Sequence, residues 1–366
     1  TCAQLYWNRA SEENNQLGGP YADIYSNITG FSVRGSSNMF NATNNKYIYM
    51  AIRAGDLTPP EHGDEAYATD TWGGGPPAYY AGFAPDMVIE KDTSTGIAWT
   101  TSARFMAGRK LQLQESGSIG TWGSAKFESS FGFYDSTASL TQYRAWMWQN
   151  RPKYFRCYGY VGNGASSRTF THDLGAVPKM IWVKAYNADE RNGDGWQIYH
   201  FGADDTAPEN YYMTTDDNGS RNSDNAIWDQ TQPTDTEWYT GTNHSVINET
   251  DGRYFVALFA ELAGVTKIGS YTMQSGGTDV DCGFSNGPRF VMIKSRSGAR
   301  DWMWFDSARG IVAGNDPYLR IGENSGNVTG QDVIDPISSG FHIPQSGNGN
   351  VANVGETYMF YAIGAE

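Results

Sequence analysis

Histidine and carboxylate side chains are the first candidates for catalysis or metal binding in this chain. The five histidines are His62, His172, His200, His244 and His342. None has the spacing of a metal-binding motif such as HExxH or lies beside a serine or cysteine nucleophile motif. A carboxylate pair of the glycosidase kind meets only in the fold, so the 40 Asp and Glu residues do not by themselves predict one. These residue types favour a protein that is not an enzyme.

Two Asp-rich loops contain the oxygen ligands that Ca²⁺ prefers. The candidate ligands are Asp189, Asp194, Asp216, Asp217, Asn218 and Asp224. Neither loop has the spacing of an EF-hand, and solvated turns are the favoured alternative. Calcium is the one cofactor for which the sequence offers candidate ligands.

Aromatic residues in polar surroundings suggest a sugar-binding surface, since an aromatic face flanked by Asn and Asp suits a sugar ring. The candidates are Trp72, Trp122, Trp228, Trp238 and Tyr239. Packing against neighbouring units is the favoured alternative role for them. By contrast, Trp99, Trp196 and Trp304 recur at one position of a repeat, which indicates core positions.

The composition indicates short strands joined by polar turns. Gly is abundant at 43 of 366 residues, aromatic residues make up 14%, and charged residues only 18%. Gly, Asn and Ser build turns, whereas aromatic and β-branched residues build strands. The net charge of −14 argues against nucleic acid as a partner. No apolar stretch is long enough for a membrane span, and Cys2, Cys157 and Cys282 are expected to be buried free thiols.

One strand-like string rich in Tyr and Phe occurs four times along the chain. Its copies are residues 47–52, 154–158, 254–259 and 358–363. The first tyrosines lie roughly 100 to 107 residues apart, which is the span of a small β-sandwich. The spacing predicts a tandem repeat of about 100 residues.

Two further strings recur in the same order. A Gly/Pro turn leads into an apolar run that ends in Lys at residues 82–91, 174–184 and 283–294. The string Trp-x-x-Ser-Ala-Arg at residues 99–104 matches residues 304–309, and the middle copy at 196–201 lacks the Ser-Ala-Arg ending. Pro before an apolar run is typical of the start of a strand.

We therefore predict an all-β fold of tandem β-sandwich units of jelly-roll type. The expected divisions are a partial unit at 1–54, a linker or loop at 55–79, and units at 80–162, 163–264 and 265–366. Residues 27–33 match residues 336–343, so the first segment resembles the second half of a unit. We expect either that the chain was cut from a longer precursor or that another subunit supplies the other half.

The strings Gly-Phe-x-Pro-x-Met-Val-x-x-Lys, Ser-Ala-Arg and Tyr-Met-Phe-Tyr-Ala-Ile resemble an uncharacterised domain in structural proteins of tailed marine and cyanobacterial bacteriophages. The resemblance covers residues 80–366 best and 1–54 partly. It implies an extracellular virion protein with a tail-fibre, receptor-binding or decoration role and no catalytic residues. The implied partners are other virion proteins or further copies, in a homo-oligomer such as a trimer, and a host surface glycan. A secreted bacterial adhesin, a carbohydrate-binding protein or a filament-forming subunit is the alternative.

Overall fold

The computed structural model describes most of the chain from residue 42 onward. The described ranges are 42–51, 57–106, 108–114, 125–127, 129–135, 142–186, 195–241, 246–345 and 348–365, together with the backbone of four N-terminal strands. Those strands are β1 (Ala3–Gln4), β2 (Asn14–Asn15), β3 (Asp23–Asn27) and β4 (Gly30–Arg34). Strands β3 and β4 form an antiparallel hairpin in which Asn27 lies opposite Gly30.

The first sandwich contains eight strands among the described residues. They are β5 (Tyr67–Thr71), β6 (Tyr79–Tyr80), β7 (Met87–Asp92), β8 (Thr100–Ala103), β9 (Leu111–Gln112), β10 (Ala125–Lys126), β11 (Gly132–Asp135) and β12 (Tyr143–Trp148). The large sheet has the order β5-β12-β7-β8-β9, and the small sheet has the order β10-β11-β6. The last strand of the unit, β12, therefore lies in the middle of the large sheet.

The second sandwich repeats this arrangement with one strand fewer in its large sheet and one fewer in its small sheet. Its strands are β13 (Phe155–Val161), β14 (Arg168–Thr171), β15 (Pro178–Ala185), β16 (Gln197–His200), β17 (Tyr211–Tyr212), β18 (Asn222–Ser223), β19 (Glu237–Thr240) and β20 (Arg253–Ala260). The large sheet is β13-β20-β15-β16, and β14 pairs with β19 in the small sheet. Strands β17 and β18 form a separate hairpin.

The third sandwich has the same order as the first. Its strands are β21 (Thr266–Thr272), β22 (Thr278–Asp281), β23 (Pro288–Ser295), β24 (Trp302–Asp306), β25 (Leu319–Ile321), β26 (Asp335–Ile337), β27 (Gly340–Ile343) and β28 (Thr357–Gly364). The large sheet is β21-β28-β23-β24-β25, and the small sheet is β22-β27-β26. The described helical residues form four short 3₁₀ turns: η1 (Gly63–Glu65), η2 (Arg104–Met106), η3 (Phe201–Ala203) and η4 (Pro208–Asn210).

Both faces of each large sheet are buried. On β7, Met87 and Ile89 face one core, while Val88 faces another. This follows from the two-residue period of a strand, which sends neighbouring side chains to opposite faces. One face packs on the small sheet of the same sandwich, and each sandwich has its own core there.

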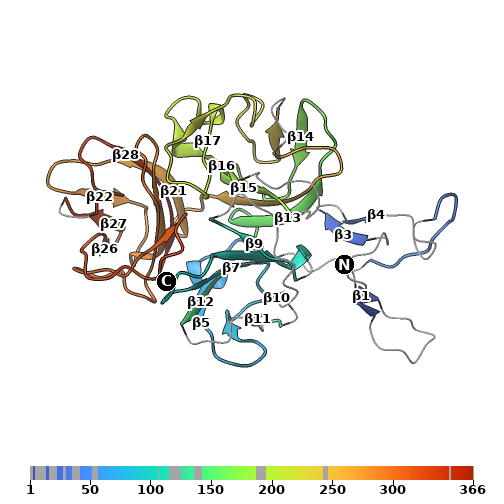
Figure 1. Ribbon diagram of the computed structural model, residues 1–366, viewed down its shortest axis with the longest axis horizontal. Helices are drawn as coiled ribbons and strands as arrows, with labels where there is room; N and C mark the ends of the chain where they lie inside the picture. The colour runs from blue at the N-terminus through green and yellow to red at the C-terminus, as the bar shows by residue number, and fades with distance from the viewer. Residues whose placement is uncertain are drawn as a thin grey trace.

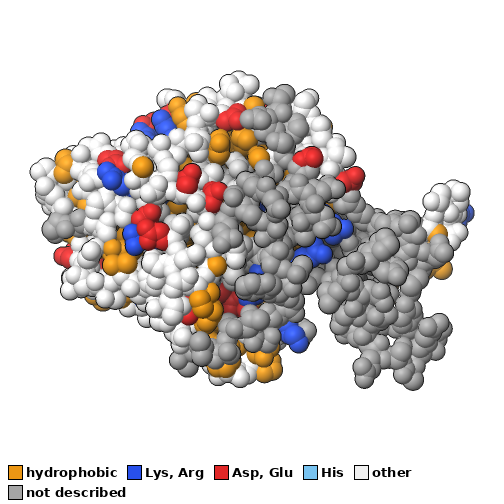
Figure 2. Space-filling view, viewed as in Figure 1, with side chains coloured by type: hydrophobic (Ala, Val, Ile, Leu, Met, Phe, Trp, Pro, Cys, Tyr) orange, Lys and Arg blue, Asp and Glu red, His pale blue; other side chains and the backbone are white. Residues whose placement is uncertain are grey.

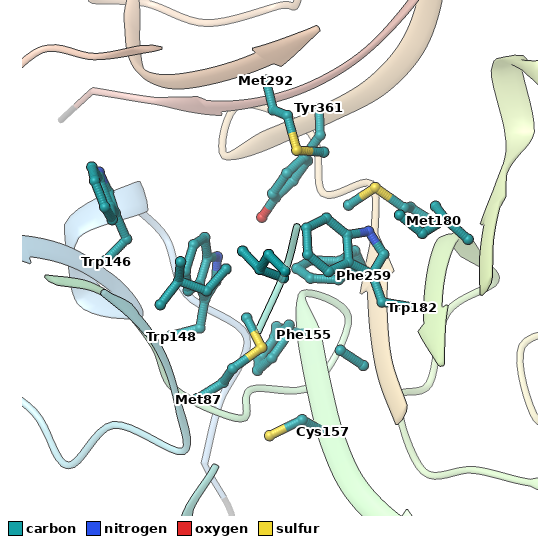
Figure 3. Packing of buried hydrophobic residues seen from close by; sticks show 14 of the residues in the cluster. Met87, Trp146, Trp148, Phe155, Cys157, Met180, Trp182, Phe259, Met292 and Tyr361 are labelled. Carbon is teal, nitrogen blue, oxygen red and sulfur yellow. The ribbon is translucent and has the colours of Figure 1, made fainter. Parts of the chain in front are cut away.

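The other faces of the three large sheets meet in one shared core. Figure 1 shows the three sandwiches as lobes around a common centre: β21–β28 on the left, β13–β20 at the top and β5–β12 at the bottom. Side chains from all three converge there, including Trp148, Trp182 and Tyr361 (Figure 3). The cavity between them measures only about 10 Å³, the lower limit for one water molecule. The three sandwiches therefore pack as a single body.

The predicted all-β sandwich class is confirmed. Two strands lie on the other side of the expected boundaries: β5 falls within the expected linker, and β13 falls within the expected first unit but pairs with β20. The string at 154–158 is therefore an edge strand that opens the second sandwich. The central strand equivalent to β20 and β28 is β12, because it lies between β5 and β7. Strands β12 and β13 both have an aromatic-rich pattern, which explains why the expected boundary between the first and second units differs from the observed one.

Candidate functional site

Two of the predicted sugar-binding aromatics are core residues, so the prediction is corrected for them. Trp228 and Trp238 are 2% and 0% exposed. The Trp228 indole N–H donates to the Tyr211 carbonyl, and Trp238 stacks on Phe170 with ring centroids 4.1 Å apart. A buried indole offers no face to a ligand. Their polar neighbours in the sequence belong to the turns around them.

Of the remaining aromatic candidates, the two that the structure describes belong to different sandwiches. Trp72 is half-buried after β5 of the first sandwich, and Tyr239 is half-buried on β19 of the second. The Tyr239 hydroxyl donates to Glu237, while Trp122 lies outside the described residues. A sugar-binding role for these three residues stays a prediction.

The candidate calcium ligands are only partly described, since Asp189 and Asp194 lie outside the described residues. Asp217 is exposed and accepts hydrogen bonds from Thr214 and Gly219. Asp224 accepts from the Ala226 amide, and the Asn218 carbonyl accepts from Lys294. Asp216 is half-buried. In the described part of the chain, no group of three or more metal-binding side chains comes together.

The contacts between the sandwiches form a closed cycle of tryptophan hydrogen bonds. Trp196 in the second sandwich donates from its indole to the Gln112 carbonyl in the first, over 2.9 Å. Trp302 in the third donates to Thr214 in the second, over 2.8 Å. Trp99 in the first donates to Arg320 in the third, over 3.0 Å. Each sandwich thus holds the next through the same donor and acceptor positions.

The strand register shows which tryptophans are equivalent. On β8, β16 and β24, one residue lies opposite the equivalent position in the middle of β7, β15 or β23. Trp99, Trp196 and Trp302 each stand two residues before that paired residue. The sequence match of Trp99 with Trp304 is therefore out of register by two residues. Trp304 is also buried in the shared core, as expected. The repeated Ser-Ala-Arg string explains the shift, because its Ser and Ala end β8 in the first sandwich but follow β24 in the third.

Polar groups at the strand ends add further contacts between sandwiches. The buried ring of His200, at the end of β16, accepts from the Gly202 amide at Nδ1 and lies 3.2 Å from the Phe360 carbonyl at Nε2. Burial lowers its pKa to about 4, so the neutral ring donates from Nε2. Asp306, at the same position of β24, accepts from the Trp146 indole of the first sandwich. Despite burial, the Arg309 guanidinium lowers the pKa of Asp306.

The first sandwich contains a buried charge cluster that sequence reasoning missed. Lys110 lies between Glu90 and Asp135, with its Nζ 3.2 Å from Glu90 Oε2 and in direct contact with Asp135 Oδ2. All three side chains are almost fully buried. The repeat contained a signal for this cluster. When the copies are aligned on the proline before each apolar run, Glu90 falls at the position of Val183 and Ile293. A charged residue at an apolar position of a repeat is a functional candidate.

The N-terminal part of the described chain exposes an apolar segment. Residues 47–51 lie outside the assigned strands, and the side chains of Ile48 and Met50 are 103% and 75% exposed. Their counterparts in the repeated string, Met359 and Tyr361, are buried in β28. Elsewhere on the viewed face, apolar side chains reach the surface in small separate groups (Figure 2).

An all-β protein of three sandwiches around one core is the class that this geometry defines. The chain belongs to the family of the domain of unknown function DUF7483, whose model matches residues 137–366. No curated protein matches the chain. Among the described residues, no helix has the length and apolar character needed to cross a lipid bilayer.

Proposed function

We propose that this chain is a non-enzymatic structural protein of a tailed-bacteriophage virion, with a tail-fibre, receptor-binding or decoration role. The observation that carries the proposal is the cycle of Trp99, Trp196 and Trp302 hydrogen bonds around a shared core. This arrangement fuses three sandwiches, which we infer to be copies of one repeat, into a rigid block. Rigid blocks of this kind suit a protein that builds or binds.

The exposed segment at 47–51 supports assembly with partners. Exposed apolar surface marks sites of protein association, and Ile48 and Met50 are its most exposed side chains. The partners we propose are other virion proteins or further copies of the chain, as in a homo-oligomer such as a trimer. Light scattering of the intact protein at several concentrations tests self-association. A monomer throughout would count against the homo-oligomer.

Localisation on the particle tests the virion role. Antibodies raised against the folded protein should label purified phage particles that encode this chain, at the fibre, the tail or the capsid surface. Electron microscopy of the labelled particles then separates the fibre role from the decoration role. Particles that lack the chain by mass spectrometry would refute the proposal.

A secreted adhesin or carbohydrate-binding protein is the second candidate, favoured by exposed aromatic rings on the first sandwich. Tyr80 and Phe131 are 64% and 56% exposed on neighbouring strand ends of the small sheet. Exposed aromatic faces stack on sugar rings. Glycan-array binding that is lost in Tyr80→Ala and Phe131→Ala but kept in the surface control Val354→Ala would support this role. Unchanged binding in both variants would exclude these rings.

A further inference from the structure

Three ionisable side chains point into the core of the first sandwich. Glu90 follows Val88 by two residues on β7, and Asp135 follows Phe133 by two residues on β11, so both carboxylates face the same core as those apolar residues. Lys110 precedes Leu111, which faces the shared centre, so its side chain enters the sandwich from β9. The large sheet thus presents a lysine and a glutamate, and the small sheet presents an aspartate.

Water is excluded from this cluster. The side chains of Lys110, Glu90 and Asp135 are 6%, 3% and 1% exposed. Tyr79 packs beside them, and burial together with the Glu90 carboxylate raises the pKa of its phenol. Neither oxygen of Glu90 has a hydrogen bond of good geometry to a described residue. Two carboxylates and one ammonium leave an unbalanced charge, which is costly in a core.

The fold itself does not require these charges. The third sandwich has the same strand order and fills the position of Glu90 with Ile293, while the second uses Val183. Tyr318 precedes β25 where Lys110 precedes β9. Replacing a buried ion pair with well-packed apolar side chains is often neutral or stabilising. We therefore expect the cluster in the first sandwich to have a chemical function.

We propose that Lys110 and Asp135 are joined by an intramolecular isopeptide bond, with Glu90 as the proton carrier. The contact of Lys110 Nζ with the Asp135 carboxyl group places the nucleophile against its electrophile. Glu90 Oε2, 3.2 Å from the same Nζ, is within reach of the protons that must move.

The reaction is a condensation that needs no oxidant, reductant or co-substrate. Transfer of a proton from the Lys110 ammonium to the Asp135 carboxylate gives a neutral amine and a neutral acid, which is favoured where charges are poorly solvated. The amine nitrogen attacks Cγ of Asp135 and forms the N–C bond. Glu90 accepts the second amine proton and returns it to the departing hydroxyl of Asp135, so that the C–O bond breaks and one water leaves. Proximity in a fixed core drives the reaction without any other catalyst.

The bond would tie the two sheets of the sandwich together. Lys110 directly precedes β9, the edge strand of the large sheet, and Asp135 lies 25 residues later in the small sheet. A covalent link of this kind prevents the two sheets from separating when the protein is pulled or unfolded. This inference does not depend on the virion role.

Intact-mass spectrometry of the full-length protein under reducing conditions tests the proposal directly. The folded wild-type chain should be lighter than its sequence by the mass of one water. A tryptic digest should lack cleavage after Lys110 and contain residues 110–126 linked to residues 127–144. A wild-type mass equal to that of the sequence, or a water loss located elsewhere, would overturn the proposal.

Variants assign the roles. Lys110→Arg and Glu90→Gln should each restore the full calculated mass, and Asp135→Asn should lose one ammonia in place of one water. The control Lys126→Arg, on the exposed side of the neighbouring strand β10, should still lose one water. If Glu90→Gln forms the bond as completely as the wild type, Glu90 is not the proton carrier.

Discussion

A single buried histidine links the second and third sandwiches and makes the molecule sensitive to acid. The Nδ1 atom of His200 accepts a hydrogen bond from Gly202, and protonation there would break it. The ring stays neutral in the fold because burial lowers its pKa from 6.5 to about 4. The unfolded chain binds the proton first, so stability is complete above pH 6.5 and is lost as the pH falls towards 4.

We therefore predict that the free energy of unfolding falls by about 3 kcal/mol between pH 6.5 and pH 4 because of His200, at roughly 1.4 kcal/mol per pKa unit. Urea unfolding at a series of pH values measures this slope. The His200→Asn variant should show a shallower slope over that window. The same substitution at the exposed His62 should leave the slope unchanged, and equal slopes in the two variants would contradict the prediction.

Residue types alone predicted whether some of the individual side chains are buried. Cys157 and Cys282 are buried and free, as expected, and burial raises the pKa of Cys282 to about 12. Trp228 and Trp238 were misjudged because polar turn residues precede and follow them in the sequence. Burial depends on what the other sheet presents, and that information is not local.

The cycle of indole hydrogen bonds operates at the scale of the strand. Replacing Trp99, Trp196 or Trp302 with Phe removes an N–H donor and leaves a carbonyl of the next sandwich without its partner. We expect each variant to lose about 1–3 kcal/mol of stability, measured by chemical denaturation. Trp72→Phe is the control, because the Trp72 indole N–H has no hydrogen-bond partner among the described residues. Losses no larger than that of the control would show that the cycle contributes little.

The exposed segment at 47–51 and the buried strand β28 share one pattern but differ in environment. Ile48 is 103% exposed, whereas Met359 at the same position of the pattern is 1% exposed. Ile48→Lys should therefore change the free energy of unfolding by less than about 0.5 kcal/mol, while Met359→Lys should prevent folding because a buried charge has no partner there. Thermal unfolding followed by circular dichroism measures both, and a destabilised Ile48→Lys would mean that the segment packs in solution.

The sequence predicted where strands lie better than it predicted which strands pair with each other. Apolar runs after Pro85, Pro178 and Pro288 are strands β7, β15 and β23, as their pattern indicated. The register between strands was less accessible, because two adjacent strands of one sheet carry similar aromatic runs. For that reason the sequence pattern places the string at 154–158 in the first unit and not in the second.

At the scale of the whole molecule, the shared core predicts one cooperative unfolding transition. Trp304 contacts rings from the first and third sandwiches, including Trp99, Trp146 and Phe290. Trp304→Ala should lower the stability of the whole molecule by about 3–5 kcal/mol, as measured by hydrogen exchange in all three sandwiches. Loss of protection in the third sandwich alone would show that the sandwiches unfold independently.

The meeting of three sheets was not predictable from the sequence. Periodicity shows that Met87 and Met180 are buried, but the same pattern results whether a face packs on its own small sheet or on another sandwich. The net charge and repeat spacing are equally compatible with an extended row of sandwiches. Only long-range contacts such as that of Trp146 with Asp306 distinguish a closed ring from a row.

The closed ring has a consequence for synthesis on the ribosome. The Trp99 indole meets a carbonyl that lies 221 residues later in the chain. At about 5–20 residues per second, the first sandwich emerges roughly 10–45 seconds before the third can cover its inner face. During that interval the sides of Trp99 and Trp146 that Trp304 later covers lie open on the nascent chain, so we expect the folding yield to rise when a chaperone shields this face.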